Sequence, residues 1–322
     1  LLLFIGWGTS ENGLILYSLY FAFAYLSLFY LFFRRVIKSD KIVTMKTGLI
    51  LEGGAMRGLF TAGVLDVFMV NDICFDGAIG VSAGAANISS YMANQKGRNF
   101  VFYTEYFQRE QYMGVKNLIH TGSYIGLDYI YSSLSDHEGD YPLDWKTIRN
   151  DPRDMMIVAT DANTGLPHYF HKYDMRQDSY DPIKASCCVP VINRPYKVDG
   201  IPYYDGGLSD PVPYEKAFAA GCDKVVVILT RPEDYRRIPK NDKIIADLLH
   251  PHYPNASQAM RNRSVVYNQQ VDACEYLQVQ GKVCIVAPDS IGKMKTLTKD
   301  KDSIEALYYK GYEEAKSILN FV

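Results

Sequence analysis

Gly80-Val81-Ser82-Ala83-Gly84 is the stretch from which the fold of this chain can be inferred. Residues 75–81 form a short apolar run that predicts a strand. Residues 83–94, rich in Ala, Ile and Ser and free of Pro, predict a helix. A serine between a strand and a helix, with a glycine two positions to either side, is the pattern of a nucleophile elbow.

The two glycines of this stretch suit an elbow because they carry no side chain. Gly80 and Gly84 leave room for the neighbouring backbone at a very sharp turn. Ser82 would then lie at a helix N-terminus, where free N–H groups and the helix dipole stabilise developing negative charge. The alternative is an ordinary glycine-rich turn in which Ser82 caps the helix.

A second glycine-rich stretch, Gly53-Gly54-Ala55-Met56-Arg57-Gly58, lies between an apolar run at 47–52 and a helical pattern at 59–71. Such a loop presents several backbone N–H groups in one direction, as an oxyanion site requires. Arg57 falls in the first turn of the predicted helix, where an exposed cation opposes the helix dipole at a cost of about 0.3–1 kcal/mol. Two interpretations of Arg57 stay open. It either shapes the loop and attracts an anion such as a lipid phosphate, or it faces solvent beside an acid.

A third stretch, Tyr203-Tyr204-Asp205-Gly206-Gly207, places a carboxylate at the end of a short β-type run, with two glycines that permit close backbone approach. Together the three stretches resemble the patatin-like phospholipase family, which carries Gly-Gly-x-Arg-Gly, Gly-x-Ser-x-Gly and Asp-Gly-Gly in this order. The resemblance covers residues 47–213 and includes the segments 159–165 and 185–190.

This resemblance implies a lipid acyl-ester hydrolase of the phospholipase A, lysophospholipase or esterase kind, working through a Ser–Asp dyad. Ser82 would be the nucleophile and Asp205 the proton acceptor. The remaining residues carried over are those of the oxyanion loop, Gly53, Gly54, Ala55, Arg57 and Gly58, and the motif glycines Gly80, Gly84, Gly206 and Gly207. A lipid or phospholipid substrate and a membrane surface are the expected partners, and no cofactor or metal is expected.

The dyad requires an unusually basic aspartate, because a carboxylate with a pKa near 4 is a weak base for a serine hydroxyl. Burial in a closed, apolar site would raise that pKa. A Ser-His-Asp triad is the alternative, since His250 and His252 follow Asp205 in the chain order of α/β-hydrolases. Prolines at 251 and 254 favour a surface turn for these histidines.

Two further alternatives come from other functional classes. One is a membrane-tethered binding protein whose elbow is catalytically idle. The other is a phosphate-binding enzyme built on the stretch 53–58, which lacks the G-K-[ST] ending of a P-loop.

The order strand, glycine loop, helix, strand, elbow, helix predicts an α/β fold. We expect a three-layer sandwich with a largely parallel central sheet covered on both faces. Residues 132–150 predict a surface loop whose acids lack metal-ligand spacing, and 181–189 a short helix capped by Asp181. The aromatic-rich segment 100–131 suits either core packing or an acyl-chain pocket.

Composition excludes other classes. A formal charge of −2 gives no basic footprint for nucleic acid. Six cysteines without a C-x-x-C pair argue against zinc and indicate reduced, buried thiols in a cytoplasmic protein.

Residues 1–44 differ from the rest of the chain. Leu14 to Phe33 is an uncharged apolar run long enough to cross a bilayer, and the basic residues after it would hold the enzyme at the cytoplasmic face of the membrane. Because the chain begins at Leu1 and Met45 precedes the first predicted strand, a mis-assigned start is the other interpretation.

We therefore expect three regions: 1–44, a catalytic domain at 45–213, and an extension at 214–322 that completes or covers the sheet. Within the extension, 224–229 and 283–287 predict strands, and 255–277 and 303–320 predict helices.

Overall fold

The computed structural model describes residues 45–321. One mixed sheet of eight strands has the order β5-β6-β3-β2-β1-β7-β8, with β4 paired to β3. The strands are β1 Thr47–Leu51, β2 Gly77–Val81, β3 Asp154–Asp161, β4 Pro167–His171, β5 Tyr196–Val198, β6 Ile201–Asp205, β7 Lys224–Ile228 and β8 Val283–Val286. The α-helices are α2 Gly58–Val70, α3 Ala83–Met92, α4 Arg98–Thr104, α5 Val115–Thr121, α6 Trp145–Asn150, α7 Asp181–Ser186, α8 Tyr214–Ala219, α9 Lys240–Leu249, α10 Pro254–Val279 and α11 Lys301–Glu314.

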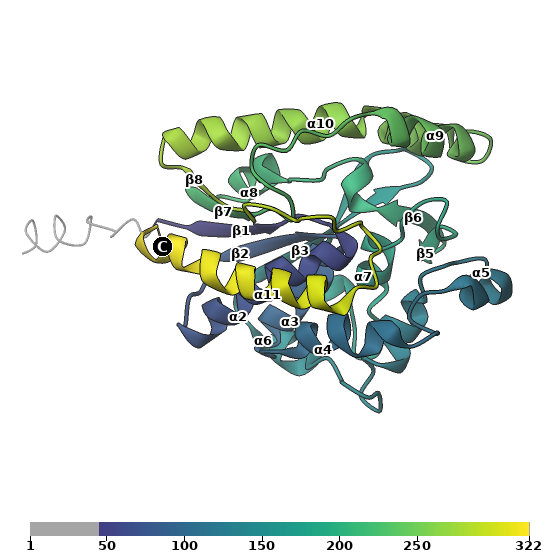
Figure 1. Cartoon of the computed structure of the whole chain (residues 1–322), viewed down its shortest axis with the longest axis horizontal. Helices are drawn as coiled ribbons and strands as arrows, with labels where there is room; N and C mark the ends of the chain where they lie inside the picture. Colours follow the sequence, from purple (N-terminus) through teal and green to yellow (C-terminus); the bar gives the residue numbers. More distant parts are fainter. Residues whose placement is uncertain (1–44, 322) are drawn as a thin grey trace, which may run out of the picture. The chain divides into compact units, whose positions relative to one another are not determined.

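The predicted α/β class is confirmed. Strands β3, β2, β1, β7 and β8 run parallel, whereas β4, β5 and β6 join antiparallel. Helices α8 and α10 lie over one face of the sheet, and α2, α3 and α11 lie over the other (Figure 1). The helices and the sheet between them form three layers.

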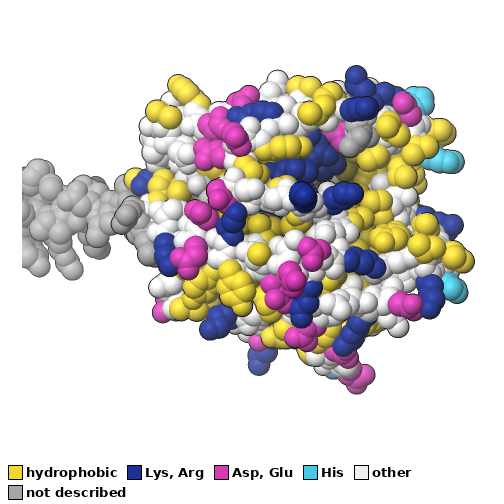
Figure 2. Space-filling model, in the orientation of Figure 1, with side chains coloured by type: hydrophobic (Ala, Val, Ile, Leu, Met, Phe, Trp, Pro, Cys, Tyr) yellow, Lys and Arg dark blue, Asp and Glu magenta, His cyan; other side chains and the backbone are white. Residues whose placement is uncertain are grey.

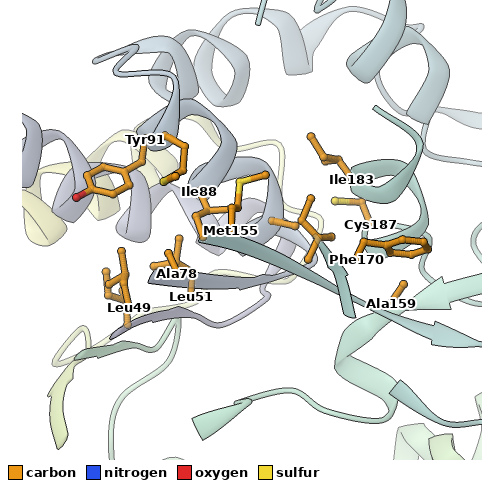
Figure 3. Packing of buried hydrophobic residues seen from close by; sticks show 14 of the residues in the cluster. Leu49, Leu51, Ala78, Ile88, Tyr91, Met155, Ala159, Phe170, Ile183 and Cys187 are labelled. Atoms are coloured by element: carbon orange, nitrogen blue, oxygen red, sulfur yellow. The ribbon is translucent and has the colours of Figure 1, made fainter. Parts of the chain in front are cut away.

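The alternating directions of the β1 side chains explain why helices cover both faces of the sheet. Leu49 and Leu51 face the α2/α3 side, where they pack with Ala78 and Ile88 in one apolar cluster (Figure 3). Ile50 points to the opposite cluster, under α8 and α10. Successive side chains of a strand alternate between faces, so an apolar run such as 49–51 needs helices on both sides.

The strand register brings two distant segments together at one edge of the sheet. Val81, the last residue of β2, pairs with Val158 of β3. The next residue of β3, Ala159, pairs with Asp205 at the end of β6. Ser82 follows Val81 directly, so Ser82 and Asp205 come to the same edge of the sheet, next to the Val158–Ala159 segment of β3.

The C-terminal region is packed into the same body as the rest. Strand β8 pairs with β7, and helix α11 crosses α2 closely. At the crossing, a Cβ on Gly63 would collide with the carbonyl oxygen of Tyr308, and one on Gly311 would collide with that of Phe60. From Lys46 onward the described chain forms one compact unit.

Local expectations differ from the structure in the segment 132–150 and in helix α7. The segment is not simply a surface loop, because Leu134 and Trp145 are buried and residues 145–150 form α6. Asp181 is the first residue of α7 and not its cap, and the helix ends at Ser186.

Two other expectations are wrong in part. Of the six cysteines expected to be buried, Cys187, Cys188 and Cys274 are buried, Cys222 and Cys284 are half-buried, and Cys74 is exposed in the segment between α2 and β2. The last predicted helix is α-helical only to Glu314 and continues as a 3-10 helix, Ala315–Asn320.

Within residues 45–321, no helix combines the length and the apolar character needed to span a bilayer. The apolar run Leu14 to Phe33 lies outside the described residues.

Candidate active site

Ser82 adopts the backbone geometry of a nucleophile elbow. Its φ is 55° and its ψ is −123°, a conformation that costs a non-glycine residue free energy. Its side chain makes no capping hydrogen bond to α3, so the helix-cap alternative is not what the structure contains. A Cβ on Gly80 would lie 2.7 Å from the Ala85 nitrogen, and one on Gly84 would collide with the Leu51 carbonyl oxygen. Both positions therefore require glycine.

The glycine loop after β1 lies directly against Ser82. A Cβ on Gly53 would come 2.8 Å from the Ser82 Cβ, so no side chain separates the two backbones. The Thr230 hydroxyl donates to the Gly53 carbonyl at 2.9 Å, and the Met56 N–H donates to the Thr296 carbonyl at 3.2 Å. In the part of the chain that the structure describes, the N–H groups of Gly53 and Gly54 have no hydrogen-bond acceptor. The loop is thus held in place while these two donors stay free.

The other predicted loop residues also lie at this site. Ala55 has a positive φ of 47° and lines a cavity together with Ser82. At Gly58, the first residue of α2, a Cβ would come 2.6 Å from the Tyr103 hydroxyl and 2.9 Å from the Ala83 Cβ. The α2 N-terminus therefore packs closely onto the start of α3.

Asp205 ends β6 and is 4% exposed. Its carboxylate accepts a hydrogen bond from the Gly207 N–H at 2.8 Å, and Gly206 packs so closely on Val158 that a Cβ there would strike the Val158 carbonyl. Burial raises the pKa of Asp205, while the charge of Arg263 and the nearby Ser82 hydroxyl act in the opposite direction. The carboxylate is therefore a stronger base than an ordinary aspartate, which is the direction that a Ser–Asp dyad requires.

The pH dependence of turnover gives a first prediction. Only the charged form of Asp205 can accept a proton, so kcat/KM should fall as pH falls through its raised pKa. The acid limb should therefore lie above the ordinary aspartate range. Arg263→Gln removes a cation that stabilises this carboxylate and should move the limb to higher pH. The measurement is the pH profile of kcat/KM for a neutral ester, with Arg261→Gln on the outer face of α10 as the matched control. A limb that Arg263→Gln leaves in place, or moves to lower pH, would contradict the assignment.

The histidines of the triad alternative lie elsewhere. His250 and His252 are exposed in the turn after α9, and His252 lines a different cleft with Leu248 and Tyr253. Among the described residues, no hydrogen bond or ion pair joins either histidine to Ser82 or Asp205. The structure does not bring a histidine to the dyad.

An apolar cavity of about 60 Å³ opens beside Ser82. Its lining includes aromatic and aliphatic side chains from the segment 103–131: Tyr103, Tyr112, Met113, Ile125, Leu127, Ile130 and Tyr131. Burial raises the pKa of Tyr112 and holds that of Tyr131 well above 10, so both stay neutral. The two interpretations of the aromatic segment are therefore compatible, because the same buried side chains form core and cavity wall. The wall of this small cavity is therefore apolar and uncharged.

Ser186 is a residue of the site whose role the sequence reasoning did not identify. Its hydroxyl accepts a hydrogen bond from the Ser82 N–H at 2.8 Å and donates to the Val158 carbonyl at 2.6 Å. It thereby ties the elbow to β3, and it commits the Ser82 N–H, which is then unavailable to an oxyanion. In the sequence, Ser186 is only a serine between apolar residues in the segment 185–190, and nothing there indicates its hydrogen bond to Ser82.

Ser186→Ala should leave the buried Ser82 N–H without a partner and destabilise the protein by about 1–3 kcal/mol. Ser89→Ala is the matched control. Ser89 is equally buried, but its hydroxyl only adds a bond to the Ala85 carbonyl within α3. Urea denaturation of the wild type and both variants measures the difference. Equal free energies of unfolding for the two variants would show that Ser186 does not anchor the elbow.

Arg57 is buried, at 4% exposure, so the solvent-facing interpretation is wrong. Its Nη1 donates to the Thr296 hydroxyl at 3.0 Å, and its Nε has no partner within the described chain. Burial, and then the charge of Arg231, lowers the pKa of Arg57 to about 10, whereas Glu52 raises it. The guanidinium keeps its proton at neutral pH, and it lies where an anion at the glycine loop would meet it.

Over residues 45–321, no three His, Cys, Asp or Glu side chains are grouped as metal ligands would be.

Comparison with known proteins adds to this geometry. A model of the patatin-like phospholipase family matches residues 49–218, more than half of the 322 residues. A second model, of a domain of unknown function (DUF6363), matches residues 253–321.

Two individual proteins are similar to this chain. The uncharacterized protein YjjU of Escherichia coli (strain K12) is 32% identical over 200 residues, a match that covers 61% of this chain and 55% of YjjU. The chain thus spans about half the length of this curated relative. The crystal structure of VipD from Legionella pneumophila matches with a TM-score of 0.44 and 13% identity, over 86% of this chain and 67% of that one.

Proposed function

This chain belongs to the patatin-like phospholipase family, and we propose that it hydrolyses acyl esters of lipids with Ser82 as nucleophile and Asp205 as base. The observation that carries the proposal is the strand register, which brings the elbow at Ser82 and the end of β6 at Asp205 to the same edge of the sheet. The glycine loop packs directly on Ser82, and its Gly53 and Gly54 N–H groups have no acceptor within residues 45–321. The apolar cavity beside Ser82 supports an acyl substrate.

The reaction follows from the positions of these groups. The Ser82 Oγ attacks the ester carbonyl carbon and its proton passes to the Asp205 carboxylate. The carbonyl oxygen, now negative, accepts hydrogen bonds from the N–H groups of Gly53 and Gly54. As the intermediate collapses, the bond to the alcohol breaks and Asp205 returns the proton to the leaving alkoxide. A water then attacks the acyl-enzyme, again giving its proton to Asp205. The bond between the acyl carbon and the Ser82 Oγ breaks, Asp205 returns the proton to this oxygen, and the fatty acid leaves.

Two features of the site lower the activation barrier of this reaction. Removal of one oxyanion donor typically costs about 2.7–4 kcal/mol, so the free donors of the loop lower much of the barrier. The raised pKa of Asp205 brings its basicity closer to the working pH, which favours proton transfer. No metal or cofactor takes part in this scheme.

A fluorophosphonate probe tests the proposal directly, because it reacts with an activated serine. Incubation of the full chain with the probe, followed by peptide mass spectrometry, should place the label on Ser82. Heat-denatured protein is the control and should stay unlabelled. If folded protein took no label, or took it on another serine, the proposal would be refuted. The alternative of a binding protein with a catalytically inactive elbow would then be favoured.

A further inference from the structure

Four arginines come from the segments around the glycine loop and Asp205, and none of them lines the apolar cavity beside Ser82. A Cβ on Gly207 would lie 3.1 Å from the Asp205 Oδ1 and 3.5 Å from the Arg263 Nη2, so Arg263 lies beside the Asp205 carboxylate. We call Arg57, Arg231, Arg237 and Arg263 the arginine cluster. Arg57 belongs to the glycine loop, Arg231 and Arg237 to the segment after β7, and Arg263 to α10. Figure 2 shows basic side chains inside the hollow below α10. Three of the four therefore come from the C-terminal region, for which the sequence suggested no chemical role.

The arginine cluster carries surplus positive charge. Arg237 is neutralised by Asp242, with two contacts of 2.8 and 3.0 Å. Among the described residues, Arg57, Arg231 and Arg263 form no ion pair with a carboxylate within 4 Å.

The acids near the cluster do not cancel this surplus. Glu52 is already bonded by the Thr230 N–H at 2.6 Å and Asp205 by the Gly207 N–H at 2.8 Å. Burial raises the pKa of both carboxyl groups. Two acids thus face three arginines that have no ion-pair partner of their own.

Buried hydrogen-bond donors of the cluster also lack protein partners. The Arg57 Nε and the Tyr267 hydroxyl are both buried and form no hydrogen bond within residues 45–321. Tyr267 lies one helical turn beyond Arg263 on α10, so both side chains project from the same face of the helix. The Tyr267 ring meets Tyr235 edge-on at 6.1 Å, and the Arg231 guanidinium stacks over Tyr235 at 4.2 Å. Most buried polar groups are hydrogen-bonded, so these donors indicate a site for an acceptor.

We propose that Arg57, Arg231 and Arg263 bind the phosphate of an acyl-glycerol phosphate whose ester lies at Ser82. This inference rests on the proposed function. Guanidinium groups are well matched to phosphate, to which they donate paired hydrogen bonds. The acyl chain would enter the apolar cavity while the phosphate, a few bonds away along the glycerol, meets the arginines.

The charge of the cluster also sets which head group it favours. A terminal phosphate carries about −1.5 to −2 charges at neutral pH, which suits a site with surplus cations. A choline head group would bring a further cation to the arginines and is disfavoured by that repulsion. The C-terminal region therefore makes the enzyme selective for lipids that end in a phosphate.

The test compares kcat/KM for oleoyl lysophosphatidate and for oleoyl lysophosphatidylcholine, which differ only in head group. The wild type should prefer lysophosphatidate, and Arg231→Gln with Arg263→Gln should reduce this preference about tenfold to a hundredfold. Arg261→Gln removes the same charge from the outer face of α10, where Arg261 pairs with Asp247, and should keep the preference. Arg231→Gln alone, in a loop and partly exposed, should show part of the effect if the double variant does not fold.

Calorimetry on Ser82→Ala separates the outcomes. Inorganic phosphate and lysophosphatidate should each bind, and both should bind less well when Arg231 and Arg263 are also replaced. Binding of inorganic phosphate without any lysophosphatidate preference would overturn the lipid head group as the source of the phosphate. A lysophosphatidate preference that survives the arginine substitutions would overturn the site itself. If the wild type showed neither probe labelling nor neutral-ester turnover, the proposed function itself would be refuted.

Discussion

Ser82→Ala is expected to lower kcat for ester hydrolysis by about 10⁴- to 10⁶-fold, because no other group can form the acyl-enzyme. The measurement is turnover of a short-chain nitrophenyl ester, with fluorophosphonate labelling in parallel. Ser89→Ala, on the same helix and equally buried, is the control and should keep full activity. Retention of turnover in pure Ser82→Ala protein would exclude Ser82 as the nucleophile.

A second variant at this position separates catalysis from strain. Ser82 holds a positive φ of 55°, which glycine adopts freely and alanine does not. Ser82→Gly should therefore be as inactive as Ser82→Ala but more stable to denaturant. Such a result would show that the strain serves the position of the hydroxyl and not the stability of the fold.

Asp205→Asn carries the second-largest expected effect, a loss of about 10²- to 10⁴-fold in kcat/KM. Asparagine keeps the shape and can still accept the Gly207 N–H, but it cannot take the Ser82 proton. The acid limb of the pH profile should disappear together with the activity, because the group that titrates there is gone. Free energies of unfolding should change little, since the substitution removes a buried charge without removing volume.

Asp210→Asn is the matched control for this variant. Asp210 is also buried, and burial raises its pKa too, but its partners are Tyr169 and Gln270 and not Ser82. It should retain turnover and the acid limb. If Asp205→Asn retained the same turnover and the same limb, a different base would have to serve Ser82.

Local sequence patterns predicted much of the fold. The apolar run before Ser82 became β2, the helical pattern after it became α3, and the buried-type run 224–229 became β7. These elements depend on residues close together in the chain, whose periodicity and glycines determine strand, turn and helix. Antiparallel strands β4 and β5 were not predicted, because strands of five and three residues are too short to show a clear alternation of apolar and polar side chains.

Only the parts of the site that are formed by residues close together in the chain could be predicted. The elbow and the glycine loop are continuous stretches, so their residues and the need for glycine could be recognised directly. Ser186 and the arginine cluster could not, because their roles depend on partners far away in the sequence. A serine in a short helix gives no sign that it will bond the Ser82 N–H.

The sequence by itself determined the α/β elements, the sharp turn at Ser82 and the glycine loop that follows β1. Only the tertiary structure decided that the end of β6 pairs with β3 next to the elbow, that Arg57 is buried, and that Arg263 lies beside Asp205. The physical reason is that backbone geometry follows from neighbouring residues. The environment of a charge, and therefore its pKa and its partners, is set by whichever distant segments pack around it.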